Sequence, residues 1–311
     1  MARPIIIDTD PGQDDAVALL LALASPKELE VLGITTVAGN VPLDLTTRNA
    51  LMMTELAGRP GVPVYAGCER PMARPLITAE YVHGKTGIDG AGTPDPVTGP
   101  ADGHGVDVII ETARATPGLT ICALGPLTNL GTALDQAPDI ASNLEQIVLM
   151  GGGFFEGGNT TPAAEFNIYV DPQAADIVFS AGIPLVMMPL DVTHRALTSD
   201  ARVDAFKALG NASGAATAGM LEFFERYDME RYGTVGAPLH DPTVIAYLLE
   251  PGMFGGRNCA VAIETESELT MGMTVIDWWG LTDRDPNCLV IHEIDDERFF
   301  ALLTERIGRL P

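Results

Sequence analysis

The sequence is poor in positive charge. It has 18 Lys and Arg residues against 42 Asp and Glu residues, which gives a formal net charge of -24. A surface with that balance repels phosphate backbones and anionic lipid headgroups. We therefore expect neither nucleic acid nor a membrane as a partner. A bound cation or a neutral small molecule fits this charge better.

Cysteines and long apolar runs are also scarce. The four cysteines form no Cys-x-x-Cys pair, and no histidine stands at zinc-ligand spacing from them, so no zinc site is expected. Cys122 and Cys259 lie in apolar stretches and are predicted to be buried thiols. The longest apolar run, Ala16–Ala24, is far shorter than the roughly 20 residues that span a bilayer. The N-terminus lacks the apolar stretch of a secretory signal, so we expect a cytoplasmic protein.

What the chain does have is a regular alternation of strand and helix signals. Short β-branched runs such as Pro4–Asp8 and Leu29–Val37 alternate with helical segments such as Asp14–Ala24 and Pro42–Leu56. This alternation is typical of βαβ units and predicts an α/β fold: an open, mostly parallel central sheet with helices on both faces. Neither an internal repeat nor a linker interrupts the pattern. We therefore expect residues 1–311 to form a single domain.

The alternation continues to the end of the chain after one irregular segment. Residues 67–104 are rich in Gly and Pro, and a segment of that kind is usually a functional loop or lid. Ligands of open α/β sheets bind at the carboxyl ends of the strands, so chemistry is expected directly after each strand. The further strands are expected at Val64–Ala66, Leu119–Ala123, Gln146–Met150, Leu185–Met188, Ala260–Ile263, Met273–Ile276 and Leu289–Ile294. The further helices are expected at Val106–Ala115, Leu127–Gln136, Asp171–Ser180, most of 199–231, His240–Leu249 and Asp296–Ile307.

Four carboxylates stand close together directly after the first expected strand. The segment Asp8–Asp15 reads D-T-D-P-G-Q-D-D, and these charges would repel one another strongly without compensation. A hard cation relieves that repulsion, because Ca²⁺ prefers six to eight oxygen ligands and Mg²⁺ fewer. Asp14 and Asp15 are neighbours at a helix start, so their side chains diverge by roughly 100°. One of them can face a metal while the other faces a ligand. The alternative is a helix start with capping acids, which would account for any single one of these residues.

The same segment resembles the N-terminal signature D-x-D-P-G-x-D-D of the inosine-uridine preferring nucleoside hydrolase family. The resemblance continues along the chain in the family's order. It implies a Rossmann-like α/β fold and an enzyme, acting on N-glycosyl compounds, that hydrolyses the bond between ribose and base in ribonucleosides. The further matching blocks are Gly39-Asn40, Gly125-Pro126-Leu127-Thr128-Asn129, Met150-Gly151-Gly152, Asn159, Glu165-Phe166-Asn167, Asp171-Pro172 and His240-Asp241-Pro242.

The resemblance also implies roles for individual residues. Asparagine suits a polyhydroxyl ring because one side chain both donates and accepts hydrogen bonds. Glu165 and Asn167 are two apart, so in an extended segment their side chains point to the same side. The implied Ca²⁺ ligands are Asp10, Asp15, Asp241 and the backbone carbonyl of Leu124. The implied substrate contacts are Asp14, Asn40, Asn159, Glu165 and Asn167 on the ribose, with Met150 near the sugar and His83 near the base. Taken singly, these asparagines could be loop residues, Met150 a core residue and His83 solvent-facing.

The expected mechanism follows from the transition state of ribosyl hydrolysis, which resembles an oxocarbenium ion. It needs a water nucleophile, stabilisation of positive charge in the sugar and a proton for the departing base. The expected nucleophile is a Ca²⁺-bound water activated by Asp10 as general base. Asp14 and Glu165 would stabilise the positive sugar. His240 is the expected acid, because an unperturbed histidine has a pKa of about 6.5.

Two other functions compete with this prediction. A haloacid dehalogenase-like phosphatase also carries D-x-D after its first strand, but Gly12 stands where that motif wants Thr or Val. A non-catalytic nucleoside- or sugar-binding protein would not need Asp10, Asp241 and His240 together. The sequence leaves open the choice between purine and pyrimidine bases, the physiological pathway within nucleoside salvage, and whether the expected homo-oligomer is a dimer or a tetramer. It also leaves open whether Tyr227, Arg231 and Tyr232, in a stretch that resembles a mobile lid, contact the base.

Overall fold

The computed structural model describes residues 2–232 and 236–311, with side chains outside 226–232. Over these residues one nine-stranded sheet forms the centre of the molecule, in the order β3-β2-β1-β4-β5-β6-β9-β7-β8. The strands from β3 to β9 pair in parallel, and β7 runs antiparallel to both β9 and β8. The strands are β1 (Arg3–Thr9), β2 (Leu29–Thr36), β3 (Val64–Ala66), β4 (Leu119–Ala123), β5 (Leu144–Met150), β6 (Leu185–Met188), β7 (Phe254–Ile263), β8 (Thr274–Asp277) and β9 (Cys288–Ile294).

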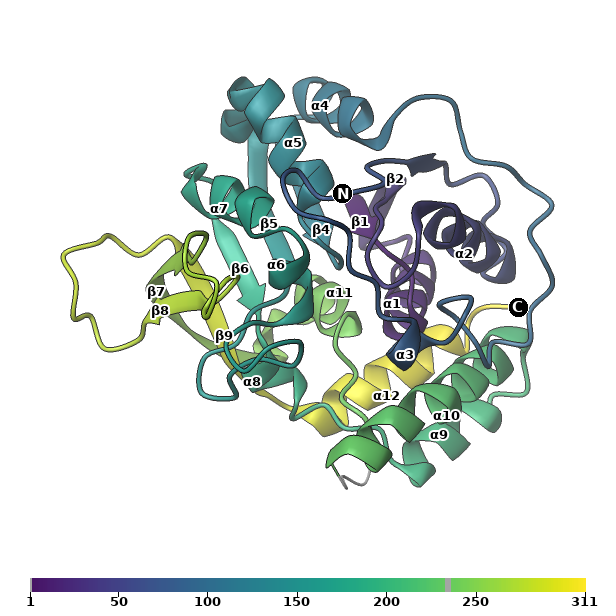
Figure 1. The fold of residues 1–311 in the computed structure, drawn as a ribbon. Coiled ribbons are helices and arrows are strands. Elements are labelled where there is room, and N and C mark those ends of the chain that lie inside the picture. The colour runs from purple at the N-terminus through teal and green to yellow at the C-terminus, as the bar shows by residue number, and fades with distance from the viewer. Residues whose placement is uncertain (1, 233–235) are drawn as a thin grey trace.

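Helices cover both faces of this sheet, as the sequence predicted. Alternate residues of β1 enter different cores: Ile5 and Ile7 pack with one group of helices and Ile6 packs with the other. In Figure 1, α4, α5 and α7 lie on one side of the sheet, and α1, α2, α11 and α12 lie on the other. The helices are α1 (Gln13–Leu23), α2 (Leu43–Leu56), α3 (Glu80–His83), α4 (Gly105–Ala115), α5 (Thr128–Gln136), α6 (Phe166–Val170), α7 (Pro172–Ser180), α8 (Leu190–Thr193), α9 (Asp200–Lys207), α10 (Ala212–Tyr232), α11 (Pro242–Leu249) and α12 (Asp296–Ile307).

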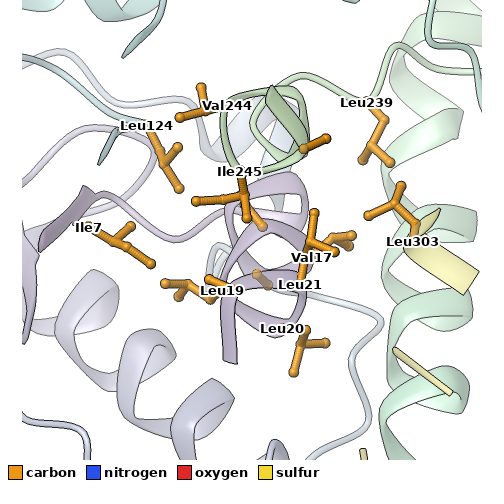
Figure 2. Close-up of a cluster of buried hydrophobic side chains, with 14 of the residues drawn as sticks. Ile7, Val17, Leu19, Leu20, Leu21, Leu124, Leu239, Val244, Ile245 and Leu303 are labelled. Atoms are coloured by element: carbon orange, nitrogen blue, oxygen red, sulfur yellow. The ribbon is translucent and has the colours of Figure 1, made fainter. Parts of the chain in front are cut away.

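Helix α1 is buried along its whole length. Its residues are apolar on every side after the first turn, which is the composition of a helix enclosed by other elements rather than one that covers a surface. Figure 2 shows Leu19, Leu20 and Leu21 of this helix pointing into a cluster that includes Ile7 of β1, Ile245 of α11 and Leu303 of α12. The N-terminus of α1 is therefore held rigidly at the carboxyl end of β1.

The structure differs from the sequence prediction mainly in short elements. The helices α3, α6 and α8 were not predicted, because segments of four or five residues carry no measurable periodicity. Strand β7 begins at Phe254 rather than Ala260. Its first half contains two glycines and the exposed Arg257 and Asn258, so it carries no clear strand signal, although it pairs with β9. The prediction that Glu165 and Asn167 lie in an extended segment is wrong. Glu165 caps α6 and Asn167 lies in its first turn.

The prediction of two buried thiols agrees with the structure. Cys122 and Cys259 are buried free thiols. Within the part of the chain that the structure describes, none of the helices is long and apolar enough to cross a membrane. The register of the parallel strands brings Asp8 beside both Thr35 and Ala123, so the residues that follow β1, β2 and β4 emerge together.

Candidate functional site

A cavity of about 480 Å³ lies where the carboxyl ends of the central strands meet. It is bordered by Asn40 after β2, Leu124 after β4 and Met150 at the end of β5. Ten of the residues singled out in the sequence border it: Asp14, Asn40, His83, Leu124, Met150, Asn159, Glu165, Asn167, His240 and Asp241. Asp10 and Asp15, each 1% exposed, do not border the cavity.

Asp10 is enclosed by backbone. A Cβ atom at Gly39 would collide with Oδ2 of Asp10, and one at Gly125 would collide with Oδ1, so both positions require glycine. The backbone N–H of Asn40 donates to Oδ2 at 2.7 Å, whereas Oδ1 is buried with no hydrogen-bond partner. The glycines of the blocks Gly39-Asn40 and Gly125-Pro126 thus let two chain turns close around one carboxylate.

Asp15 is fixed by donors from three directions. Thr9 Oγ1 donates to Oδ1 at 2.5 Å, and the backbone N–H of Gly12 donates to Oδ2 at 3.0 Å. The amide of Asn40 donates to the same Oδ2 at 3.2 Å, and also to the backbone carbonyl of Asp10 at 3.1 Å. Asn40 therefore links the two carboxylates as well as bordering the cavity.

Asp15 is also one of three buried carboxylates that lie close together. One oxygen each from Asp14, Asp15 and Asp241 lies within 4.8 Å of the others. Burial raises the pKa of Asp241 well above its usual value, and repulsion from Asp14 and Asp15 adds to this. The pKa of Asp14 is raised for the same reasons, burial first, and its Oδ1 has no hydrogen-bond partner. Burial, then repulsion from Asp15, also raises the pKa of Asp10. Such a cluster lacks positive charge, and a cation would provide it.

The opposite wall is built around Glu165. Its Oε1 accepts from the backbone N–H of Asn167 at 2.9 Å, and its Oε2 accepts from that of Gly152 at 2.9 Å. Burial raises its pKa to about 7, although these hydrogen bonds oppose the rise. The amide of Asn167 donates to the carbonyls of Leu124 at 2.7 Å and Met150 at 3.2 Å. Asn159 accepts from the N–H of Phe166 at 3.0 Å, which holds it in the same wall.

Two of the cavity's histidines, His83 and His240, have strongly lowered pKa values. His83 is 7% exposed, so the alternative of a solvent-facing loop residue is wrong. Nδ1 of His240 lies 2.8 Å from Oγ1 of Thr193, and its ring lies 5.9 Å from that of His194. Burial lowers the pKa of His240 to about 3, assisted by repulsion from His194 and His83. The expectation of an unperturbed pKa at His240 is therefore wrong, and the main cause is desolvation of a partly buried ring at the edge of the cavity.

Several cavity residues were not predicted from the sequence. Nδ1 of His194 lies 3.1 Å from Oε2 of Glu156, and both side chains border the cavity. Asp191, which follows β6, accepts from the backbone N–H groups of Phe154 at 2.8 Å and Phe155 at 2.7 Å and so anchors the loop that carries Glu156. The position of Asp191 after a strand was the signal that could have found it. Phe224 also borders the cavity. The side chains of Tyr227, Arg231 and Tyr232 fall outside the described residues.

Comparison with known proteins identifies relatives along the whole chain. The model of the family described as inosine-uridine preferring nucleoside hydrolase matches residues 5–301. The pyrimidine-specific ribonucleoside hydrolase RihA of Salmonella schwarzengrund is 48% identical over 309 residues, with 99% of each chain covered. An uncharacterized protein of Schizosaccharomyces pombe, C1683.06c, is 54% identical over the same length and coverage. The solved structure of a purine-preferring ribonucleoside hydrolase from Gardnerella vaginalis superposes with a TM-score of 0.92 at 33% identity and covers 98% of each chain.

These matches include both ends of the sheet and every block of the cavity wall, so they reflect the whole protein rather than one shared motif. They favour the hydrolase over the phosphatase and the non-catalytic binding protein. The chain therefore belongs to the inosine-uridine preferring nucleoside hydrolase family, and it hydrolyses the N-glycosidic bond between ribose and base in ribonucleosides.

Proposed function

We propose that this hydrolase uses Ca²⁺ held by its buried carboxylates and prefers pyrimidine ribonucleosides. The observation that carries the metal proposal is the convergence of Asp14, Asp15 and Asp241 within 4.8 Å. The unpartnered buried oxygens Oδ1 of Asp10 and Oδ1 of Asp14 support it, because each lacks the positive or donor group that a buried carboxylate requires. An all-oxygen donor set of this kind suits a hard cation.

The ligands we assign to the cation are Asp10, Asp15, Asp241 and the carbonyl of Leu124. Asp14 lies in the three-carboxylate cluster and also borders the cavity, so its side chain can serve the ion, the sugar or both. When bound, the cation supplies a low-pKa water and lowers the repulsion among the carboxylates. The chain's own residues perform the remaining steps.

Asp10 is the general base in this proposal. Its Oδ2 accepts from the backbone N–H of Asn40. Oδ1, the oxygen that we also assign to the cation, would accept the proton of the attacking water through its second lone pair. Positive charge then develops in the ribose, and the carboxylates of Asp14 and Glu165 face the same cavity and stabilise it. The carboxylate of Glu165 is fixed by backbone donors, so it needs no reorganisation as that charge appears.

We assign the ribose hydroxyls to Asp14, Asn40, Asn159, Glu165 and Asn167, with Met150 packing against the sugar. All five polar side chains border the cavity, and those of Asn40, Asn159, Glu165 and Asn167 are oriented by hydrogen bonds to the backbone. His83 is assigned to the base, next to the aromatic ring of Phe224.

His240 is the proton donor that we assign to the leaving base. The assignment rests on position, since His240 borders the cavity directly before the metal ligand Asp241. Burial keeps the ring neutral in the free enzyme. In this proposal the neutral ring takes up a proton from solvent when the nucleoside is bound. It transfers that proton to the leaving nitrogen of the base as the glycosidic bond breaks, and is neutral again afterwards.

The preference for pyrimidines rests on the relatives. The RihA protein, named as pyrimidine-specific, shares 48% of its residues with this chain, whereas the purine-preferring enzyme shares 33%. The test is to measure free ribose released from uridine, cytidine and inosine under matched conditions. We expect kcat/KM to be highest for the two pyrimidine nucleosides. A higher kcat/KM for inosine would contradict the preference and leave the hydrolase assignment intact.

The remaining expectations concern the whole protein. We propose that residues 1–311 act as one domain, which the single sheet supports. Assembly as a homodimer or homotetramer, a cytoplasmic location and a place in nucleoside salvage stay predictions.

A further inference from the structure

His83 is held on three sides within the cavity wall. A Cβ atom at Gly12 would collide with its ring, so that position must be glycine for the ring to lie there. Phe224 stacks on the ring at a centroid distance of 5.5 Å with 27° between the planes. The third contact is a hydrogen bond between Nδ1 of His83 and Oε1 of Gln13, at 2.8 Å.

The orientation of the Gln13 amide is set by its other bonds. Its Nε2 donates to the backbone carbonyl of His83 at 2.9 Å and to that of Asp89 at 3.2 Å. Exchanging the two amide atoms would place Oε1 against two carbonyl oxygens, which offer no hydrogen. Gln13 is fully buried, so neither oxygen could turn to water instead. The atom that faces His83 is therefore the amide oxygen.

An amide oxygen can only accept a hydrogen bond, so Nδ1 of His83 must carry a hydrogen. Burial lowers the pKa of His83 to about 3, so the ring carries one hydrogen rather than two at neutral pH. Nδ1 is used by Gln13 and the ring borders the cavity, which leaves Nε2, without a hydrogen, for a ligand.

We infer that Gln13 is a positioning residue that fixes His83 in the Nδ1–H tautomer, so that Nε2 of His83 accepts a hydrogen bond from a donor group of the bound nucleoside. In that tautomer His83 cannot donate a proton from Nε2, so it serves in substrate recognition and not as the acid. This role rests on the proposed nucleoside site, whereas the tautomer itself does not.

The primary test is two-bond ¹H–¹⁵N correlation spectroscopy of the full-length enzyme with ¹⁵N-labelled histidine. The signals of His83 are identified by their absence in His83→Gln. We expect the pattern of a neutral ring protonated at Nδ1 alone, at neutral pH and without substrate. An Nε2–H pattern or an imidazolium pattern in the unmodified enzyme would overturn the inference. This NMR measurement does not depend on enzyme activity, so it still tests the tautomer if the proposed substrate preference is wrong.

The role of Gln13 is tested with Gln13→Met, which keeps the length of the side chain and removes the acceptor. We expect His83 to lose its single Nδ1–H pattern, in favour of Nε2–H or a mixture. The matched control is Asn49→Leu, because Asn49 anchors the same region through the carbonyls of Pro11 and Thr86 without touching His83. Retention of Nδ1–H in folded Gln13→Met, or its loss in Asn49→Leu, would show that Gln13 does not set the tautomer.

Kinetics test the acceptor role. Loss of one neutral hydrogen bond to substrate is expected to raise KM of Gln13→Met by about 3- to 10-fold, with kcat nearly unchanged. The donor on the substrate is found with N3-methyluridine and the three monodeoxy analogues of uridine. The effect of Gln13→Met should vanish on the analogue that lacks the donor. If the same effect persists on all four analogues, or if kcat falls instead of KM rising, Nε2 of His83 is not a substrate acceptor.

Discussion

At the scale of single residues, glycines and one asparagine fix the positions of the buried carboxylates. Gly39 and Gly125 give Asp10 room between two chain turns, and Asn40 bonds to both Asp10 and Asp15. A Cβ at either glycine would displace the carboxylate that we assign as general base. The proposed role of Asp10 therefore requires glycine at both of these positions.

The assignment of Asp10 is tested by Asp10→Asn, which keeps the size of the side chain and one oxygen but cannot accept a proton as a base. We expect kcat for uridine to fall by roughly 10²-fold or more. The matched control is Asp102→Asn, which makes the same charge change at an exposed position and should leave kcat unchanged. Near-normal turnover of Asp10→Asn with calcium bound would refute the role of Asp10 as base.

The assignment of His240 is tested by two substrates with different leaving groups. A nucleobase leaves poorly without a proton, whereas nitrophenolate leaves readily. We expect His240→Ala to lose ~10²–10⁴-fold in kcat on uridine and nearly to keep its rate on p-nitrophenyl riboside. Calcium content is measured in parallel, since Asp241 is adjacent. Equal losses on both substrates with calcium retained would mean that His240 maintains site geometry instead of donating the proton.

At the scale of elements, the buried helix α1 ties the site to the core. It places Asp14 and Asp15 in its first turn, and its remaining turns lie among the side chains shown in Figure 2. The fully buried leucines of such a helix each contribute roughly 1.5–3 kcal/mol relative to exposure. The first turn is therefore held by packing that continues far from the cavity.

Leu20→Ala tests this support. Leu20 is completely buried in the cluster of Figure 2, so its truncation should lower the free energy of unfolding by about 2–5 kcal/mol. Leu269→Ala is the matched control, because Leu269 is 85% exposed and should change stability little. Urea unfolding monitored by circular dichroism measures both. Equal stabilities for the two variants would show that α1 is not the support we describe.

At the scale of the whole molecule, the alternation of strand and helix signals made most of the fold predictable. The rule that ligands bind after parallel strands made part of the site predictable. The Asp8–Asp15 cluster was found because four carboxylates stand directly after a strand, whereas His240-Asp241 was found only through the resemblance to the family's blocks. The pair of Gln13 and His83 was not found, since the two residues are 70 positions apart and meet only through the path of an irregular loop. The same limit applies to Glu156 with His194. Helices as short as α3 and α6 leave no periodic signal, so the cap at Glu165 was also missed.

The net negative charge of the chain and the buried carboxylates of the site both favour a bound cation. With a net charge of -24, the fold carries excess repulsion, and its buried carboxylates are the groups least able to relieve that repulsion through water. A cation that binds the folded state alone would stabilise it by ordinary ligand linkage. Catalysis and stability should therefore respond together to the same ion.

Removal and return of calcium is the measurement that tests this account most directly. The enzyme is stripped with a strong chelator, its metal content is checked by elemental analysis, and ribose release from uridine and the thermal midpoint are recorded before and after calcium is added back. We predict that the stripped enzyme loses ribose release and melts at a lower temperature, and that Ca²⁺ restores both. Full ribose release from enzyme shown to be free of metal would contradict the account.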